Sequence, residues 1–252
     1  MYRQIKLALK SILPESLLFG LEPLMRQLYA LPFKGGEYHC PICNTDLKKW
    51  IPINEAADNL CPACGSIART RLMTELHLAE PLRLDKQSWS VLHFSPSRAL
   101  KRLLRKYPKL EYVTTDYESK YEDHNYDITS IPEPDDRFDL IICFHVLEHI
   151  PDDRKAMEEL FRIIKPGGTI LLQTPFQEGA TYEDLSITSE AEREKHFGQK
   201  DHVRIYGFDD FVLRLEAVGF KINRKKASQL LSDETLRRLA LKGESVVVFA
   251  SK

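Results

Sequence analysis

The stretch from residue 138 to residue 168 constrains the fold of this chain more than any other part of the sequence. It begins with a continuous apolar run, Leu140, Ile141 and Ile142, which suits a strand buried on both faces of a parallel sheet. Asp152 is a candidate cap for the helical pattern that follows, and Pro166-Gly167-Gly168 ends that pattern before a second apolar run at 169–172. Strand, helix and strand in this order predict a right-handed βαβ unit.

Similar strand patterns occur on both sides of this unit, and helical patterns separate the first five strands. We therefore predict an α/β fold with a doubly wound, mostly parallel, Rossmann-like sheet of seven strands. The predicted strands are residues 89–94, 112–115, 126–128, 140–144, 169–174, 220–223 and 245–250. Helices are predicted at residues 66–78, 97–106 and 232–241.

The strand at 140–144 leads into His145, Glu148 and His149, at the edge where α/β sheets place their ligands. The motif C-F-H-V-L-E-H-I-P-D-D from residue 143, with K-P-G-G at 165–168, closely resembles the fourth and fifth strand region of class I S-adenosylmethionine-dependent methyltransferases, in particular the methyltransferase type 11 family. Together with two C-x-x-C pairs at 40–43 and 61–64, L-H-F-S-P-S from residue 92 and F-G-Q-K-D-H-V-R-I-Y-G from residue 197, this segment makes the chain similar, over residues 38–224, to bacterial zinc-ribbon methyltransferases. The resemblance implies a transferase that uses S-adenosylmethionine as methyl donor.

Four of the five cysteines form two C-x-x-C pairs, Cys40 with Cys43 and Cys61 with Cys64. Two such turns at this separation present four thiolates to one tetrahedral Zn²⁺. Because four cysteines leave no coordination position open, we expect the zinc to be structural. A redox role for the C-x-x-C pairs is the alternative, and the duplication of the motif counts against it.

Three regions are predicted: an N-terminal helical segment at 1–36, a zinc-binding module at 37–80 and a methyltransferase domain at 86–252. The first region has apolar residues at helical spacing, interrupted by Pro14 and Pro23, and we expect one or two helices that pack on the rest of the protein. The alternative is a cationic amphipathic segment that makes weak peripheral contact with a membrane through residues 1–30.

The composition limits which partners and which cellular compartment we expect. Lys and Arg number 36 and Asp and Glu 37, so no overall field draws the chain to nucleic acid. No run approaches the ~18 apolar residues of a membrane span, and paired cysteines favour a reducing compartment. We expect a cytoplasmic protein without a transmembrane segment.

The turn after the first predicted strand differs from that of most class I methyltransferases, because L-H-F-S-P-S lacks their glycines. Ser95 and Ser97 still offer hydroxyl and N–H groups, and Arg98 suits the carboxylate of the donor. Asp116 follows the second strand at the offset of the acidic residue that binds ribose hydroxyls. By resemblance, Asp127 and Ile128 lie along the adenine. The remaining predicted cofactor-binding residues are Phe94, Tyr117 and Phe144.

The acceptor side is predicted to include the catalytic residues His145, Glu148, His149 and His202. Ubiquinone and small-RNA O-methyltransferases hold a divalent cation with an E-x-x-E-H segment, whereas this chain has His145 in place of the first Glu. A second divalent cation and plain base catalysis by His145 or His202 therefore both stay open. The long insertion at 175–207 is expected to cover the acceptor pocket.

We predict an S-adenosylmethionine-dependent methyltransferase that acts on a hydroxyl or amine of a small-molecule or glycan-like acceptor. The first alternative is an RNA methyltransferase whose zinc module docks the substrate, and the balanced charge counts against it. A second alternative is a non-catalytic module that lost donor affinity together with its glycines.

Overall fold

A computed structural model describes residues 13–53, 59–78 and 82–252. The chain divides into two compact units, each described by itself below. The cysteine unit comprises the residues up to 83 with 97–103 and 227–245, and the sheet unit comprises 84–96, 104–226 and 246–252. The predicted helical residues 5–12 lie outside the described part of the chain, and the three predicted regions stay a prediction.

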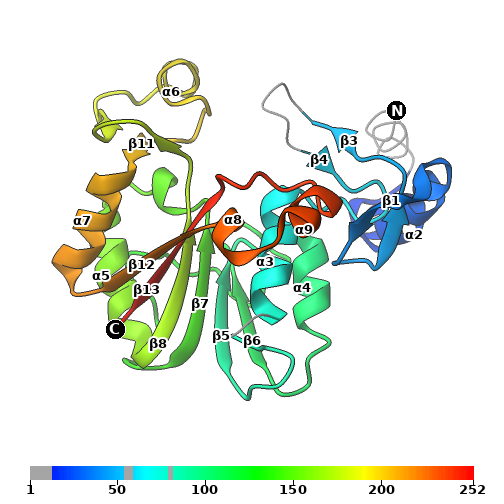
Figure 1. The fold of residues 1–252 in the computed structure, drawn as a ribbon. Helices are drawn as coiled ribbons and strands as arrows, with labels where there is room; N and C mark the ends of the chain where they lie inside the picture. The colour runs from blue at the N-terminus through cyan, green and yellow to red at the C-terminus, as the bar shows by residue number, and fades with distance from the viewer. Residues whose placement is uncertain (1–12, 54–58, 79–81) are drawn as a thin grey trace. The chain divides into compact units, whose positions relative to one another are not determined.

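The sheet unit contains a mostly parallel sheet with six strands, not the seven predicted (Figure 1). β5, β6, β7 and β8 are parallel to one another, and β13 runs antiparallel between β8 and β12. In spatial order the strands are β12 (Lys221–Lys226), β13 (Val246–Ser251), β8 (Ile164–Gln173), β7 (Phe138–Phe144), β5 (Ser90–Phe94) and β6 (Glu111–Thr115). This order places β8 and β7 in the middle of the sheet, and the chain reverses its direction across the sheet between β5 and β7: β6 lies beside β5, and β8 lies on the other side of β7.

The missing strand is the one predicted at 126–128. Asp127 Oδ1 accepts hydrogen bonds from the backbone N–H and the hydroxyl of Thr129, at 2.8 and 2.7 Å, and folds this segment into a turn. An isolated bridge between Thr115 and His124, just before the segment, and a hydrogen bond from Tyr126 N to Thr115 Oγ1 at 3.0 Å join this part of the chain to β6. The local side-chain hydrogen bonds of Asp127 thus replace the ladder that a seventh strand would require.

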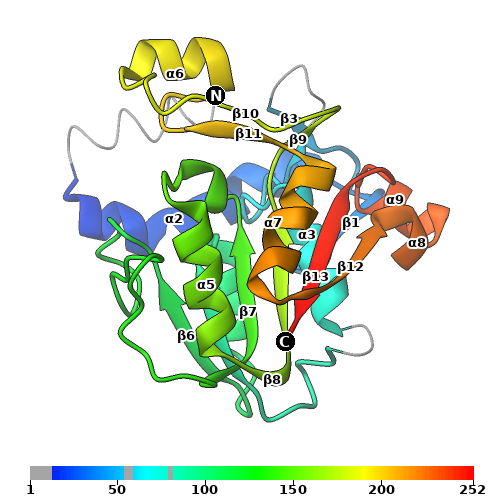
Figure 2. The same ribbon diagram turned by 90° about the vertical axis from the view of Figure 1, so that its left-hand side faces the viewer.

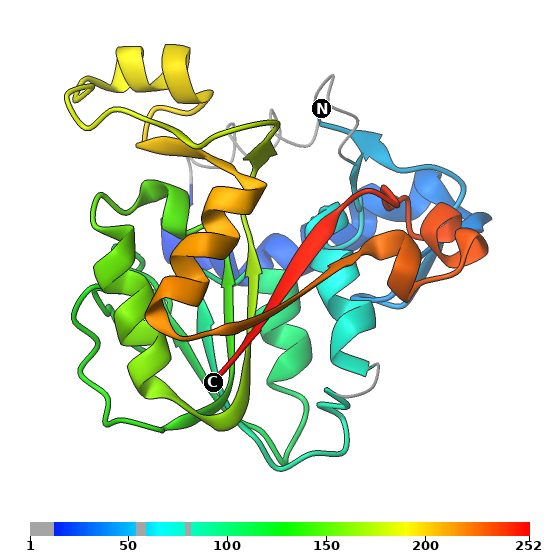
Figure 3. The same cartoon turned by 60° about the vertical axis from the view of Figure 1, so that its left-hand side comes forward.

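Helices α5 (Asp153–Ile163) and α7 (Phe208–Val218) lie side by side on one face of the sheet (Figures 2 and 3). The apolar residues of α5, at positions 156, 157, 160 and 163, recur at helical spacing and are fully buried. The Asp152 side chain accepts a hydrogen bond from Lys155 N at 3.0 Å, which confirms its predicted role as the cap. Burial of this face holds the β7–α5–β8 unit together.

The insertion at 175–207, which follows β8, forms a small structure of its own that contains α6, β10 and β11 (Figure 2). Its three strands pair in the order β10, β11, β9, and its helix α6 is capped at the N-terminus by Ser189. The elements are β9 (Phe176–Gln177), β10 (Tyr182–Glu183), α6 (Glu190–Phe197) and β11 (Arg204–Gly207), and a 3-10 turn, η2 (Leu147–His149), precedes α5.

The cysteine unit is held together by Arg71, whose side chain is fully buried. Its guanidinium stacks on Trp50 at 4.0 Å and donates hydrogen bonds to the carbonyls of Asn59, Ser66, Leu239 and Ala240. One cation therefore joins three separate parts of the sequence. The elements are α2 (Glu15–Ala30), η1 (Leu31–Phe33), β1 (Lys34–Cys40), β2 (Thr45–Leu47), β3 (Ile51–Pro52), β4 (Asn59–Leu60), α3 (Ala68–Leu78), α4 (Arg98–Leu104), α8 (Ala227–Leu230) and α9 (Asp233–Arg238).

The predicted helices at 66–78, 97–106 and 232–241 all form, each somewhat shorter than predicted, as α3, α4 and α9. Within the described ranges, each helix is too short or too polar to cross a lipid bilayer.

Candidate functional site

A cavity of about 860 Å³ opens at the carboxyl ends of β5, β6 and β7. These three strands are adjacent and parallel, with Phe94 level with both Thr115 and Cys143, so the residues that follow them meet at one edge. The volume lies in the range typical of small-molecule sites. Eight predicted site residues line the cavity: Phe94, Ser95, Asp116, Tyr117, Asp127, Ile128, His145 and His149.

Two residues at this edge have backbone angles that side chains disfavour. Ser95, directly after β5, has φ of 46°, and His145, directly after β7, has φ of 56°. Hydrogen bonds hold both turns: Ser95 N donates to Thr115 O at 2.8 Å, and His145 N donates to Gln173 O at 2.7 Å. The loop after β5 thus keeps a left-handed conformation that glycine would adopt freely, although its sequence lacks glycine.

Asp116 and Asp127 each combine a structural contact with an accessible oxygen. Asp116 Oδ1 accepts hydrogen bonds from the N–H groups of Glu118 and Ser119, at 3.0 and 2.8 Å. The Oδ2 atoms of Asp116 and Asp127 accept no hydrogen bond from any residue in the described ranges, and both aspartates line the cavity. One oxygen of each carboxylate caps a turn, and the other can accept hydrogen bonds from a ligand.

Glu148 is the most deeply buried acidic residue of the site, with 1% of its surface exposed. Its Oε1 lies 3.2 Å from His145 Nδ1, at ion-pair distance, and neither carboxylate oxygen accepts a hydrogen bond from the residues that the structure describes. Although burial acts to raise it, contact with His145 and the proximity of His149 lower the pKa of Glu148. A buried carboxylate whose oxygens accept no hydrogen bond requires a cation or further hydrogen-bond donors.

Glu148, His149 and His202 each offer a ligand atom within 4.8 Å of the other two. The rings of His149 and His202 meet edge to face at 4.6 Å, and His149 Nδ1 lies 3.3 Å from a carboxylate oxygen of Asp201. Burial, with a smaller effect of His149, lowers the pKa of His202, so this imidazole is neutral near pH 7. Two imidazoles and a carboxylate form a donor set that a divalent cation of the zinc type accepts.

Arg204 holds the turn that carries these residues. Its guanidinium, 1% exposed, donates to the carbonyls of Leu147, Ile150 and Pro151 and to Glu183 Oε2 at 2.8 Å. A backbone hydrogen bond from Val203 N to Glu148 O, 3.0 Å long, adds to this contact. The insertion and the end of β7 therefore meet around the candidate site, as the sequence predicted.

Other predicted residues lie elsewhere. Phe144, Glu148 and His202 do not line the cavity, although Glu148 and His202 adjoin His145 and His149. Ser97 and Arg98 belong to the cysteine unit, where Arg98 pairs with Glu22 at 2.5 Å and lies 3.6 Å from the ring centre of Phe19. Further residues line the cavity but were not predicted: Glu118, Tyr126, Thr129, Val146, Ile150, Pro151, Asp152, Glu190, Lys200 and Asp201.

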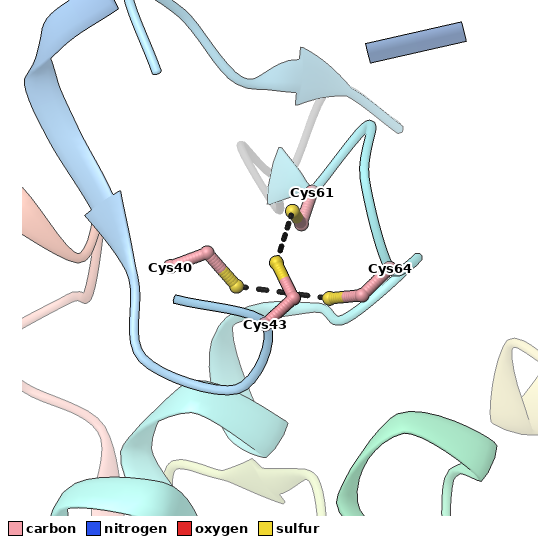
Figure 4. A group of neighbouring side chains, drawn as sticks. All are labelled: Cys40, Cys43, Cys61 and Cys64. Carbon is pink, nitrogen blue, oxygen red and sulfur yellow. Dashed lines mark hydrogen bonds between the residues drawn. The ribbon is translucent and has the colours of Figure 1, made fainter. Parts of the chain in front are cut away.

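The four cysteines of the C-x-x-C pairs meet in the cysteine unit (Figure 4). Cys40 Sγ lies 3.6 Å from Cys64 Sγ, and Cys43 Sγ lies 3.8 Å from Cys61 Sγ. Tetrahedral Zn–S bonds of about 2.3 Å place the sulfur atoms about 3.8 Å apart, so the cluster fits a zinc ion. Contact with Cys40 and the other sulfur atoms, together with burial, raises the pKa of Cys61, and a bound dication would reverse this effect.

The fold, and a cavity at the carboxyl ends of its adjacent parallel strands β5, β6 and β7, are typical of nucleotide-binding α/β domains. A family model described as "Methyltransferase domain" matches residues 74–225, more than half of the chain. The chain belongs to this methyltransferase family.

Curated relatives match over short stretches. The uncharacterized methyltransferase YcgJ of Bacillus subtilis is 46% identical over 43 residues, which cover 17% of each chain. A ubiquinone biosynthesis O-methyltransferase of Pseudomonas fluorescens is 38% identical over 42 residues, 17% of this chain and 18% of the relative. Ajmaline N-methyltransferase of Rauvolfia serpentina is 30% identical over 67 residues, 27% of this chain and 23% of the relative. The chain thus spans less than a quarter of the length of these relatives.

Solved structures resemble the chain over a larger part. Phosphoethanolamine N-methyltransferase 2 of Haemonchus contortus, bound to S-adenosylmethionine, has a TM-score of 0.48 and 14% identity over 72% of this chain and 52% of the other. A methyltransferase dependent on S-adenosylmethionine from Archaeoglobus fulgidus has a TM-score of 0.46 and 16% identity over 71% of this chain and 93% of the other.

Proposed function

We propose that this protein transfers a methyl group from S-adenosylmethionine to a hydroxyl or amine of a small-molecule or glycan-like acceptor. The observation that carries the proposal is the cavity at the ends of β5, β6 and β7, where Ser95, Asp116 and His145 converge. Membership in a methyltransferase family supports the choice of donor. The named relatives include both O- and N-methyltransferases, which supports a hydroxyl or amine acceptor.

The donor half of the proposal uses residues from two strand ends. Asp116 Oδ2 accepts hydrogen bonds from the ribose hydroxyls, while Asp127 and Ile128 lie along the adenine. The hydroxyl of Ser95, which lines the cavity, binds the methionine part. Arg98 belongs to the cysteine unit and pairs there with Glu22, so of the predicted cofactor-binding residues it has the weakest structural support.

The acceptor half uses the histidines. His145 lines the cavity and is oriented by Glu148, and His202 is held neutral by burial. Either imidazole can remove the acceptor proton as the methyl group transfers, and alignment of the acceptor with the sulfonium carbon supplies most of the acceleration. The proton moves to an imidazole nitrogen, the acceptor atom forms a bond to the methyl carbon, and the C–S bond of the donor breaks with its electron pair on sulfur, so that S-adenosylhomocysteine leaves.

Six carboxylates line the cavity, from Asp116, Glu118, Asp127, Asp152, Glu190 and Asp201, against one lysine, Lys200. This lining repels the phosphates of a nucleic acid and favours a cationic or polyhydroxylated acceptor. The cavity therefore supports a small molecule or glycan over RNA.

Two metal sites belong to the proposal. The four cysteines hold a structural Zn²⁺ that stabilises the small cysteine unit. Glu148, His149 and His202 would hold a second divalent cation, which would polarise an acceptor oxygen when bound. Without it, the same three side chains orient the acceptor and accept its proton.

Calorimetry with S-adenosylmethionine and S-adenosylhomocysteine tests donor binding directly, and absence of binding would favour a non-catalytic module. A panel of polyhydroxylated and amine acceptors, assayed with methyl-labelled donor, then tests transfer. His145→Ala and His202→Ala should each reduce turnover at least about tenfold and leave donor affinity nearly unchanged, because general bases contribute factors of this size or more. Loss of donor affinity in both variants would show that these histidines are not on the acceptor side.

A further inference from the structure

Helix α2 has its charged and apolar faces reversed relative to an ordinary surface helix (blue in Figure 2). Leu17, Leu24, Leu28 and the adjoining Leu31 expose 48%, 59%, 61% and 56% of their surfaces. Their spacings of seven, four and three residues place all four on one side of the helix. An isolated exposed leucine is ordinary, but a row of four along one helix is a continuous apolar patch.

The opposite side of α2 carries the charges and is buried. The Glu22 and Arg26 side chains are only 12% and 14% exposed and pair at 3.1 Å, and Glu22 also pairs with Arg98. The Arg26 guanidinium packs so closely on Gly65 that a Cβ there would lie 2.7 Å from its carbon. The Glu22–Arg98 pair and the packing of Arg26 on Gly65 fix the rotation of the helix, so it cannot turn its leucines inward without breaking both contacts.

We propose that this leucine face of α2 (Leu17, Leu24, Leu28 and Leu31) docks on an anionic phospholipid surface, with the helix lying along the interface. Within α2, three exposed residues beside the leucines, Ser16, Gly20 and Gln27, are uncharged, so their entry into the interface desolvates no charge. Each leucine then gains from leaving water.

Charge complementarity selects the anionic surface. Residues 1–12, which precede α2, contain Arg3, Lys6 and Lys10 and no acidic residue. Basic residues next to an anionic leaflet are attracted to its negative surface potential. The apolar face and the preceding positive charges are the two components that peripheral membrane binding generally requires.

A second copy of the chain fits the same face less well. Four half-exposed leucines offer on the order of a few hundred Å², whereas a standard interface buries about 800 Å² per partner. The leucine spacing covers two heptads, short of the three or four that identify a coiled coil, and the flanking Gly20 and Gln27 supply no charged pair to fix a register.

Co-sedimentation of the full chain with vesicles tests the proposal. Wild-type protein should sediment with phosphatidylcholine–phosphatidylglycerol vesicles, and less with phosphatidylcholine alone or at high salt. The L24Q/L28Q double variant should lower the partition coefficient at least about tenfold. L213Q is the matched control, because Leu213 on α7 is also 61% exposed, and it should bind as wild type does.

The wild-type comparison between the two vesicle compositions needs no variant, so it remains informative if the double variant misfolds. Absence of wild-type binding to anionic vesicles, or equal binding by a folded L24Q/L28Q variant, would overturn the proposal. A dimer in sedimentation velocity that L24Q/L28Q abolishes, without vesicle binding by wild type, would instead assign the face to a second copy. Because vesicle binding needs no methyl transfer, its outcome is independent of the proposed activity.

Discussion

Replacement of Arg204 by alanine tests whether the insertion positions the H-x-x-E-H turn. The guanidinium is 1% exposed and bonds to the carbonyls of Leu147, Ile150 and Pro151 on one side and to Glu183 on the other. Removal of one partner from a buried, charged network costs about 3–5 kcal/mol. We expect that loss to appear locally, in the free energy that holds the 147–151 turn closed.

Amide hydrogen exchange is the direct assay, because a two-unit chain has no single unfolding free energy. The reporters are the N–H groups of His149 and Ile150, which bond to Val146 O and Leu147 O. A loss of 3–5 kcal/mol accelerates their exchange by roughly a hundredfold or more. Turnover should fall by a similar order, since small displacements of catalytic groups are costly, while donor affinity changes little.

Arg214→Ala is the matched control. Arg214 also pairs with Asp153 and Glu183, but its side chain is 29% exposed and it bonds to no carbonyl of the turn. Its loss should cost about 1 kcal/mol or less, in keeping with partly exposed ion pairs. Equal acceleration of exchange in both variants, or none in Arg204→Ala, would refute the positioning role.

Three further predictions concern other parts of the molecule. Purified protein should contain one Zn²⁺ per chain by elemental analysis, lost in Cys61→Ser and retained in Cys143→Ala; metal-free wild-type protein prepared without chelator would contradict this. Asp116→Ala and Asp116→Asn should both weaken donor binding by about 1.5–3 kcal/mol in calorimetry; because Asn keeps the Oδ1 cap, an unchanged Asn variant would assign Asp116 to the turn alone. Although burial acts to raise it, contacts with Lys165 and Ser90 lower the pKa of Asp139. The ionised carboxylate therefore contributes about 1–2 kcal/mol to the stability of the sheet unit. This contribution is present above pH ~4 and is lost as the pH falls through the folded-state pKa. Asp139→Asn should reduce the loss of stability at low pH that urea titrations measure. An unchanged loss would show that the Asp139–Lys165 ion pair is not its source.

Local sequence patterns predicted most of the fold. The buried strands and α5 are continuous in sequence, and their apolar periodicity is decided by residues a few positions apart. The strand at 126–128 was wrong because Asp127 bonds to Thr129 within the same segment, which an alternation pattern does not reveal. The burial of Arg204 depends on a turn more than fifty residues earlier in the chain, and no local pattern contains that information.

Ser95 and His145 adopt left-handed backbone conformations that the absence of glycine after β5 did not lead us to expect. Absence of glycine after β5 implied that the usual close approach of backbone to ligand is lost, yet Ser95 adopts φ of 46° and keeps the turn. A non-glycine residue in this region costs on the order of 1 kcal/mol or more, and glycine at Ser95 or His145 would remove that cost. The adjoining parallel strands β5 and β7 both end in such a residue, and both residues line the same cavity. The proposed methyl transfer gives the Ser95 hydroxyl and the His145 imidazole a ligand to contact in this cavity.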